Sequence, residues 1–507
     1  MGRALTPALI AGALLLALPA ASASPEPTTR ISVGGGGAQA NGRSFAPAIS
    51  ADGRLTAYNS EASNLVAGDT NRARDVFVYD RDRGETTRVS VDSSGAQGNG
   101  DSFAPAVSAD GRFVVFSSFA SNLVPGDTNG ADDIFVRDRT ANTTARISLG
   151  PGGAEADGGS FQPAISATGR FVVYASDATN LVAGDTNGVR DTFVYDREIG
   201  TTSRVSLATT GDQANLDTFT PTISADGRFV AFTSYSTNLV PEDINEGSDV
   251  FVHDRETGAT SRVSVYTGGY EADGDSLRSQ ISSDGRYVVF DSDAWNLSWG
   301  DWNEAFDVFV HDRQTGVTTR ISVDEGGGPA EGESIRPSIS ADGRFVAYST
   351  EASNVVAGDT NGSSDVMLYD RRSRAPARMS VANSEEEGNG DSLRPALAAD
   401  GRVVAFDSEA SNLVGGDTNR FTDIFLRDTT AAQPPPPPPP PARCIVPRVI
   451  GLRLAVARKR IGRANCRVGR VRRTRSRRVG RVLAQSPRAG RRLARGARVN
   501  LVVGRRR

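Results

Sequence analysis

The sequence has few of the residues on which most catalytic chemistry depends. Its 507 residues include 2 histidines, 2 cysteines and 3 tryptophans. It contains no Gly-x-Ser-x-Gly nucleophile elbow and no recognisable pairing of a nucleophile with a histidine. These shortages argue against an enzyme, and they leave no catalytic residue and no organic cofactor to predict.

Long hydrophobic runs are also scarce. One lies at the start of the chain, where Arg3 precedes the apolar run Leu5 to Leu18 and the small-residue triplet Ala21-Ser22-Ala23. This is the pattern of an export signal, which we assign to residues 1–23. The run is too short for a stable membrane span, and no later segment approaches the roughly 20 apolar residues that a span needs. We therefore expect a secreted protein without a transmembrane segment.

Acidic residues are absent from the end of the chain. Residues 442–507 hold 23 Arg or Lys and no Asp or Glu. The chain has 57 basic residues in all; with these 23 and Arg3 set aside, 33 remain against all 60 acids. The net charge of −3 therefore conceals an acidic body and a strongly basic tail.

The chain does contain a repeat with an interval of 58 residues. The turn Asp52-Gly53-Arg54 recurs at that interval, beginning at Asp110, Thr168, Asp226, Asp284, Asp342 and Asp400. Each unit contains four short runs rich in β-branched and aromatic residues, separated by Gly, Asp and Asn turns. Four strands repeated seven times predict a seven-bladed β-propeller, an all-β fold.

The phase of the repeat predicts how the ring closes. A lone fourth strand, Thr28 to Val33, precedes the first complete unit, and the last unit stops after its third strand, Asp423 to Asp428. We therefore expect the N-terminal strand to complete the last blade of a domain spanning residues 28–433. Proline belongs on an edge strand, so its recurrence in the first strand predicts that this strand lines the central channel. The six prolines are Pro47, Pro105, Pro163, Pro221, Pro337 and Pro395, and Ser279 takes this position in the fifth unit.

These motifs resemble the TolB-type WD-like propeller repeats. The resemblance rests on Pro-x-Ile-Ser-x-Asp-Gly-Arg, a Val-Val-Phe run and Asp-x-Phe-Val-x-Asp, and it covers residues 28–433. It implies a binding or scaffolding domain, often extracytoplasmic. The long loop between the second and third strands departs from the family. We expect this loop and the loop between blades to share one face, which is the candidate binding face.

The long loop carries Asp-x-Asn-x-x-x-Asp in all seven units. Oxygen ligands at alternate positions with glycine nearby are what Ca²⁺ requires, so the motif is a candidate calcium site. The alternative is an Asx turn, in which the short side chains bond only to local backbone. The first three copies consist of Asp69, Asn71 and Asp75; Asp127, Asn129 and Asp133; and Asp185, Asn187 and Asp191. Later copies begin at Asp243, Asp301, Asp359 and Asp417.

All three tryptophans lie in the fifth copy of this loop, at Trp295, Trp299 and Trp302. The other copies place small residues, threonine or isoleucine at these positions. An exposed aromatic cluster could stack on a sugar or bind a protein partner. The alternative is that the three rings pack on each other or on a neighbouring loop. The two histidines, His253 and His311, take a strand position filled elsewhere by Tyr or Arg, which indicates structural surface residues.

Eight consecutive prolines, residues 434–441, predict a stiff polyproline II linker of about 25 Å at roughly 3.1 Å per residue. The segment after it, residues 442–507, resembles a PASTA domain, a small α+β module. The match runs through Val446-Pro447-x-Val449-Ile450-Gly451 and Gln485-Ser486-Pro487-x-Ala489-Gly490. Cys444 and Cys466 lie in this segment, and in an exported chain a disulfide is the simplest use of the pair.

The PASTA resemblance implies binding to peptidoglycan or its stem peptides. This copy departs from the family in carrying arginine at many positions, several of them between Arg470 and Arg481, which favours attraction to anionic cell-wall polymer. The tail could instead dock on its own acidic propeller. Export and the lack of stacking aromatics in the tail argue against nucleic acid.

We therefore predict a monomeric, secreted, cell-wall-associated binding protein whose propeller recognises a protein or a glycan. The alternative is a hydrolase or lyase for glycans with its site on the long-loop face.

Overall fold

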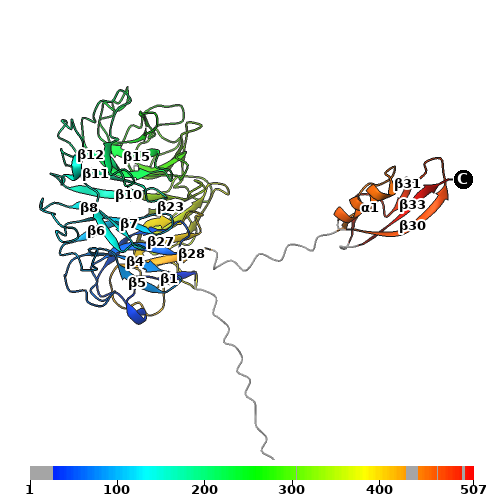
Figure 1. Cartoon of the computed structure of the whole chain (residues 1–507), viewed down its shortest axis with the longest axis horizontal. Coiled ribbons are helices and arrows are strands. Elements are labelled where there is room, and N and C mark those ends of the chain that lie inside the picture. Colours follow the sequence, from blue (N-terminus) through cyan, green and yellow to red (C-terminus); the bar gives the residue numbers. More distant parts are fainter. Residues whose placement is uncertain (1–26, 304, 430–443, 465, 494–496, 507) are drawn as a thin grey trace, which may run out of the picture. The chain divides into compact units, whose positions relative to one another are not determined.

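The computed structural model describes residues 27–303, 305–429, 444–464, 466–493 and 497–506. The chain divides into two compact units, Met1–Ala431 and Ala432–Arg507, which are described separately (Figure 1). The predicted export signal and polyproline linker lie outside the described residues. In the described part of the chain, no helix combines the length and the apolar character that crossing a bilayer requires.

The first unit consists of seven four-stranded antiparallel sheets, which are the blades of the predicted propeller. The first three blades are β2 (Ser44–Ile49), β3 (Leu55–Ser60), β4 (Asp75–Asp80) and β5 (Glu85–Arg88); β6 (Ser102–Val107), β7 (Phe113–Ser118), β8 (Asp133–Asp138) and β9 (Thr143–Arg146); and β10 (Ser160–Ile165), β11 (Phe171–Ser176), β12 (Asp191–Asp196) and β13 (Thr201–Arg204). The fourth and fifth blades are β14 (Thr218–Ile223), β15 (Phe229–Ser234), β16 (Asp249–Asp254) and β17 (Ala259–Arg262), and β18 (Ser276–Ile281), β19 (Tyr287–Ser292), β20 (Asp307–Asp312) and β21 (Val317–Arg320). The sixth blade is β22 (Ser334–Ile339), β23 (Phe345–Thr350), β24 (Asp365–Asp370) and β25 (Ala375–Arg378).

The seventh blade confirms the predicted closure. It combines β26 (Ser392–Leu397), β27 (Val403–Ser408) and β28 (Asp423–Asp428) with the N-terminal strand β1 (Thr28–Arg30), which pairs antiparallel with β28. In Figure 1, β1 accordingly lies beside β28. The paired strand is shorter than the predicted Thr28 to Val33. The seven-bladed fold and its closure by the first strand are therefore as expected.

A ring of backbone hydrogen bonds joins consecutive blades. Just before each Asp-Gly-Arg turn, one residue donates its N–H to the carbonyl of its counterpart in the next blade, as Ala51 does to Ala109 at 3.0 Å. The series runs through all seven blades and returns to the start, where Ala399 donates to Ala51 at 3.0 Å. The same hydrogen bond therefore joins every pair of neighbouring blades, including the seventh and the first, so this series of bonds is continuous around the ring.

The core of the propeller lies between adjacent blades. Leu55 and Val76 of the first blade pack with Val114, Phe116 and Phe135 of the second in one buried cluster. Phe116 and Phe135 face each other across β7 and β8 with ring centroids 5.9 Å apart. Because the second and third strands are covered on both faces, they read as continuous apolar runs rather than as alternating patterns.

Each residue of the Asp-Gly-Arg turn makes a different contribution to the structure. The Asp52 carboxylate accepts hydrogen bonds from the Ser50 hydroxyl and the Arg54 backbone N–H, which closes the turn. The Arg54 guanidinium forms a two-point salt bridge with Asp80, at 3.0 and 2.7 Å. The glycine has positive φ, and in the second blade a Cβ on Gly111 would meet the Leu55 Cδ1 atom at 2.1 Å. Glycine is therefore required both by the turn and by the neighbouring blade.

The two histidines are structural, but they are buried and do not lie on the surface as predicted. His253 and His311 are each 6% exposed, and their Nδ1 atoms lie 2.9 Å from the Thr260 and Thr318 hydroxyls. Burial lowers the pKa of His311 to about 4 and also lowers that of His253. The third strand of every blade is covered on both sides, which is why a side chain at this position loses its contact with water.

The second unit is a small α+β domain, whose described residues form one helix, α1 (Leu454–Arg463). A three-stranded sheet contains β30 (Arg467–Arg475), β33 (Arg498–Arg505) and β31 (Val482–Ser486), and a short ribbon pairs β29 (Cys444–Ile445) with β32 (Arg492–Leu493). Ala457 and Ile461 of the helix pack against Val499, Leu501 and Val503 of the sheet. The predicted disulfide Cys444–Cys466 is present and ties the first strand to the end of the helix. Such a covalent link helps a unit too small to bury a large core.

Candidate functional site

An arginine lies between the two aspartates of each Asp-x-Asn-x-x-x-Asp loop. In the first blade, the Arg88 Nη1 atom is 3.2 Å from Asp69 Oδ1 and 3.0 Å from Asp75 Oδ2. The corresponding arginine bridges both aspartates in all seven loops, with N–O distances of 2.9 to 3.7 Å. The seven bridging residues are Arg30, Arg88, Arg146, Arg204, Arg262, Arg320 and Arg378. We call this arrangement the arginine clasp.

The asparagine of the motif forms an Asx turn, the alternative considered for these loops. The Asn71 Oδ1 atom accepts a hydrogen bond from the Ala73 N–H, and its Nδ2 donates to Asp75 Oδ2 at 3.0 Å. Both bonds recur in all seven copies. The polar side chains of the loop therefore bond to one another and to the backbone, and the arginine is the cation that binds the two carboxylates.

The donor set of these loops fits a guanidinium better than Ca²⁺. Calcium takes six to eight oxygen ligands, and here the carboxylates already bind an arginine. Three loops add a glutamate. Asp127, Asp133 and Glu155, and likewise Asp243, Asp249 and Glu271, bring three carboxylate oxygens close together, and Arg378 contacts Glu387 as well as Asp359 and Asp365. Arg146 and Arg262 contact all three acids of their group. A calcium ion would have to displace the arginine, so the calcium site stays a prediction that this geometry disfavours.

The three tryptophans are exposed rather than packed on each other. Trp295, Trp299 and Trp302 are 60%, 90% and 77% exposed. They line a shallow pocket of about 550 Å³ together with two further aromatic residues, Tyr266 and Tyr270. These five side chains form what we call the aromatic patch. An exposed aromatic group of this size is unusual on a soluble protein and indicates a contact surface.

Two loops build the aromatic patch. The tryptophans lie in the long loop of the fifth blade, and the tyrosines lie in the inter-blade loop that precedes it. The inter-blade loop turns back on itself through a hydrogen bond from the Tyr266 N–H to the Tyr270 carbonyl, at 2.8 Å. The Asn296 side chain then joins the two loops by donating to the Glu271 carbonyl at 2.7 Å. The two long loops therefore lie side by side, as expected for one face of the ring.

Sequence reasoning missed the two tyrosines, although the repeat contains the signal. The other units place Gly, Asp or Ala at the position of Tyr266, and Ala, Asp, Gly or Glu at that of Tyr270. Both tyrosines therefore depart from the repeat at the same boundary between blades as the tryptophans. Whether the patch binds a ligand stays a prediction.

The second unit has a basic pocket of about 510 Å³ on the exposed face of its sheet. Arg470 and Arg472 of β30 and Arg498 of β33 line it, with Asn500 between them. Asn500 Oδ1 accepts the Arg470 backbone N–H at 2.7 Å. Side chains alternate along a strand, so these residues face away from the core residues Val499 and Leu501 that the helix covers.

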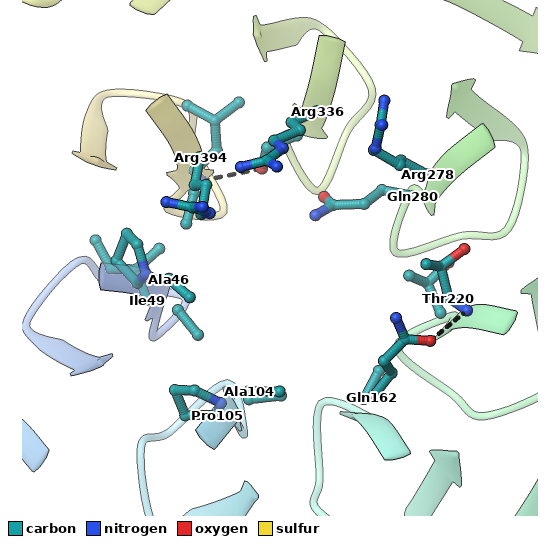
Figure 2. Close-up of a pocket in the computed structure, with 18 of the residues that line it drawn as sticks. Ala46, Ile49, Ala104, Pro105, Gln162, Thr220, Arg278, Gln280, Arg336 and Arg394 are labelled. Carbon is teal, nitrogen blue, oxygen red and sulfur yellow. Dashed lines mark hydrogen bonds between the residues drawn. The ribbon is translucent and has the colours of Figure 1, made fainter. Parts of the chain in front are cut away.

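The central channel of the propeller is lined by the first strand of every blade. Figure 2 shows this ring of strands around a cavity of about 520 Å³. The six prolines that mark the first strand lie in its wall, as predicted. Arg278, Arg336 and Arg394 also line it, on three consecutive blades.

Residues 445–505 match the family model of the PASTA domain. The C-terminal unit is a PASTA domain. Its presence and the disulfide indicate an extracytoplasmic location, because disulfides persist in oxidising compartments. Among curated proteins, no sequence matches the chain.

The first unit resembles several solved propellers in fold. TolB from Acinetobacter baumannii is 17% identical over 70% of this chain and 66% of its own, with a TM-score of 0.38. The β-propeller domain of the Trilobed protease from Pyrococcus furiosus is 11% identical over 76% of this chain and 95% of its own, with a TM-score of 0.47. An oligogalacturonate lyase from Vibrio parahaemolyticus is 11% identical over 79% of this chain and 93% of its own, with a TM-score of 0.48. The chain combines a seven-bladed propeller with a C-terminal PASTA domain.

Proposed function

We propose that this is a secreted, non-enzymatic binding protein whose PASTA domain attaches to peptidoglycan or to an anionic cell-wall polymer. The observation that carries the proposal is the basic pocket, in which three arginines line the exposed face of the sheet in a domain of the peptidoglycan-binding type. Residues 442–507 contain no acid that could neutralise them. An arginine fork suits carboxylate and phosphate groups, which anionic wall polymers carry.

The aromatic patch supports a recognition role for the propeller. Among the residues that line the patch, the one acid is Asp301, and Arg320 already binds it at 3.3 Å. An acid held in this way is a poor general acid or base. The two histidines are buried in strands and bonded to threonines. Binding of a protein or a glycan therefore suits the patch better than glycan hydrolysis or elimination.

The proposal is tested by sedimenting purified cell wall with the full-length protein and with a form that ends at Gln433. We expect the full-length protein to be retained at low salt and released at high salt, because salt screens exposed charges. The shortened form should stay in the supernatant. Equal retention of the two forms would refute attachment through the PASTA domain.

A matched pair of variants separates the basic pocket from general charge. Replacing Arg470, Arg472 and Arg498 by Gln removes three charges from the pocket. Replacing Arg458, Arg460 and Arg463 by Gln removes the same charge from the helix, which covers the other face of the sheet. We expect the first variant to lose at least tenfold in wall affinity, and the second to lose less. Equal losses would mean that binding depends on charge alone and not on the pocket.

A further inference from the structure

Three arginines are concentrated on one side of the central channel. The third residue of the innermost strand lines the channel in every blade, and these residues are Ala46, Ala104, Gln162, Thr220, Arg278, Arg336 and Arg394. The three arginines thus lie on the fifth, sixth and seventh blades, and Figure 2 shows them next to one another around the cavity. Among the residues that line the cavity they are the only charged ones.

The fold does not require these arginines. In all seven blades this residue has a φ between 46° and 56°, and the pairing of the first two strands slips at the same point. The bulge is therefore common to the ring, whereas the side chain differs from blade to blade. Alanine adopts the same backbone in the first two blades. The arginines consequently need an explanation beyond the shape of the strand.

Two of the three arginines are neutralised within their own blade. Arg278 Nη1 lies 2.9 Å from Asp291 Oδ2, and Arg394 Nη1 lies 2.5 Å from Asp407 Oδ2. Both aspartates are fully buried on the second strand of the blade. In the sixth blade the equivalent residue is Ser349. Arg336 therefore has no carboxylate opposite it.

Arg336 is the cation that remains without a partner. Its Nη1 atom is buried and makes no hydrogen bond within the described part of the chain. Its backbone N–H, by contrast, donates to Asp291 Oδ2 at 2.8 Å. Burial, together with Arg394 and Arg278 nearby, lowers the pKa of Arg336. A buried donor without an acceptor is destabilising, and more so when it is charged.

The acids that share a recess with Arg336 do not form salt bridges with it. A smaller recess of about 180 Å³ beside the arginine is lined by Glu333, Glu351 and Asp391. Within the described residues, none of these carboxylates pairs with its guanidinium. On the channel side, Gln162, Gln280 and Thr220 add polar groups to a wall of proline and aliphatic side chains. The channel is therefore a mostly apolar cavity with a few polar groups and one unpaired cation, which is typical of small-molecule sites.

We propose that the central channel binds a small molecule carrying a carboxylate or phosphate group, with Arg336 as its principal ligand. Arg278 and Arg394, each paired with an aspartate of its own blade, flank the bound anion. The cavity of about 520 Å³ admits a small organic anion. Such a ligand would accept hydrogen bonds from the Arg336 guanidinium, which has no carboxylate partner, and polar substituents on it would meet Gln280 or Gln162.

The proposal is tested by isothermal titration calorimetry of the full-length protein with citrate, inorganic phosphate and, as a neutral control, glucose. The basic tail also attracts anions. We therefore attribute to the channel only the part of the anion binding that is lost when a channel residue is replaced, and call this part the channel contribution. We expect Arg336→Gln to weaken binding of citrate or phosphate at least tenfold. Arg372→Gln removes the same charge from an exposed turn and should bind like the wild type. Arg498→Gln, in the basic pocket of the tail, should leave the channel contribution intact.

A second variant keeps Arg336 but places a carboxylate opposite it, so that its charge is neutralised. Ser349→Asp installs the carboxylate that the fifth and seventh blades already contain, so the fold has a precedent for it. We expect this variant to melt no lower than the wild type and to lose anion binding at least tenfold. Binding that survives both Arg336→Gln and Ser349→Asp overturns the channel site. The channel site is also overturned if Arg498→Gln alone removes all of the citrate and phosphate binding that the wild type shows.

Discussion

At the scale of the residue, the arginine clasps hold carboxylates that would otherwise lie buried side by side. Arg262 contacts Asp243, Asp249 and Glu271, and its side chain is 8% exposed. Replacing it by methionine keeps much of the apolar stem but leaves three acids without their cation. We expect Arg262→Met to lower the free energy of unfolding by about 3–5 kcal/mol, because an unpaired buried charge is costly. Urea denaturation measures the loss, and Arg372→Met on an exposed turn should cost less than about 0.5 kcal/mol.

The clasp also bears on calcium. Because the arginine occupies the space between the carboxylates, added Ca²⁺ or EDTA should leave the melting temperature of the wild type unchanged. A rise with calcium would show that the ion displaces the arginine, and it would restore the calcium assignment of the loops.

At the scale of the element, the aromatic patch depends on two loops that meet at one blade boundary. All three tryptophans of the chain lie in this patch, so intrinsic tryptophan fluorescence reports on it alone. We expect soluble peptidoglycan fragments or other glycans that bind the propeller to quench or shift this emission. Replacing Tyr270 by alanine should weaken that binding by about 1–3 kcal/mol, which is the range that stacking of a nucleic-acid base on an aromatic side chain contributes. The substitution leaves all three tryptophan fluorophores in place. An unchanged titration in the Tyr270→Ala variant would remove the patch from ligand binding.

The strands and their closure could be predicted from the sequence because turns and apolar runs are local signals. The repeat interval places Asp52-Gly53-Arg54 and its counterparts, and the phase of the repeat leaves Thr28 to Arg30 as the strand that completes the last blade. The clasp could not be predicted in the same way. Arg88 meets Asp69 and Asp75 only because the third and fourth strands pair and carry it back to the loop.

The channel arginines show a different limit. Arg278, Arg336 and Arg394 are visible in the sequence as departures from the repeat, just as the tryptophans are. A bulge on the first strand interrupts the alternation of faces, so the sequence alone does not show that these side chains line the channel. That Arg336 lacks a partner depends on Ser349 in the adjacent strand, which becomes informative once the strands are paired.

At the scale of the whole molecule, the propeller contains many buried carboxylates whose proton binding depends on folding. Burial raises the pKa of six aspartates to about 6 and of three to about 7, although arginines or hydroxyl groups partly offset the shift in most of them. The first group is Asp127, Asp243, Asp291, Asp365, Asp407 and Asp423, and the second is Asp132, Asp249 and Asp307. In the unfolded chain these groups titrate near 3.9.

A second set of aspartates has the opposite shift. The arginine of each Asp-Gly-Arg turn hydrogen-bonds to a carboxylate at the end of the third strand, as Arg112 does to Asp138. These bonds lower the pKa of Asp138, Asp312 and Asp370 to about 2. Their contribution to stability is present above the unfolded pKa and is lost as the pH falls below about 4.

The pH dependence of stability follows from the two sets. Between about pH 4 and pH 7 the nine buried aspartates stay protonated in the folded propeller, whereas in the unfolded chain they have lost their protons. The folded state therefore binds more protons, and its stability falls as the pH rises. His253 and His311, whose pKa values burial lowers, act in the opposite direction but are only two. We expect the melting temperature of the propeller to rise as the pH is lowered from 7.5 to about 4, and to fall below that pH. Scanning calorimetry at constant ionic strength measures it. Asp407→Asn should flatten the rise and Asp82→Asn, on the surface, should not; a melting temperature that climbs steadily from pH 5 to pH 8 would contradict the argument.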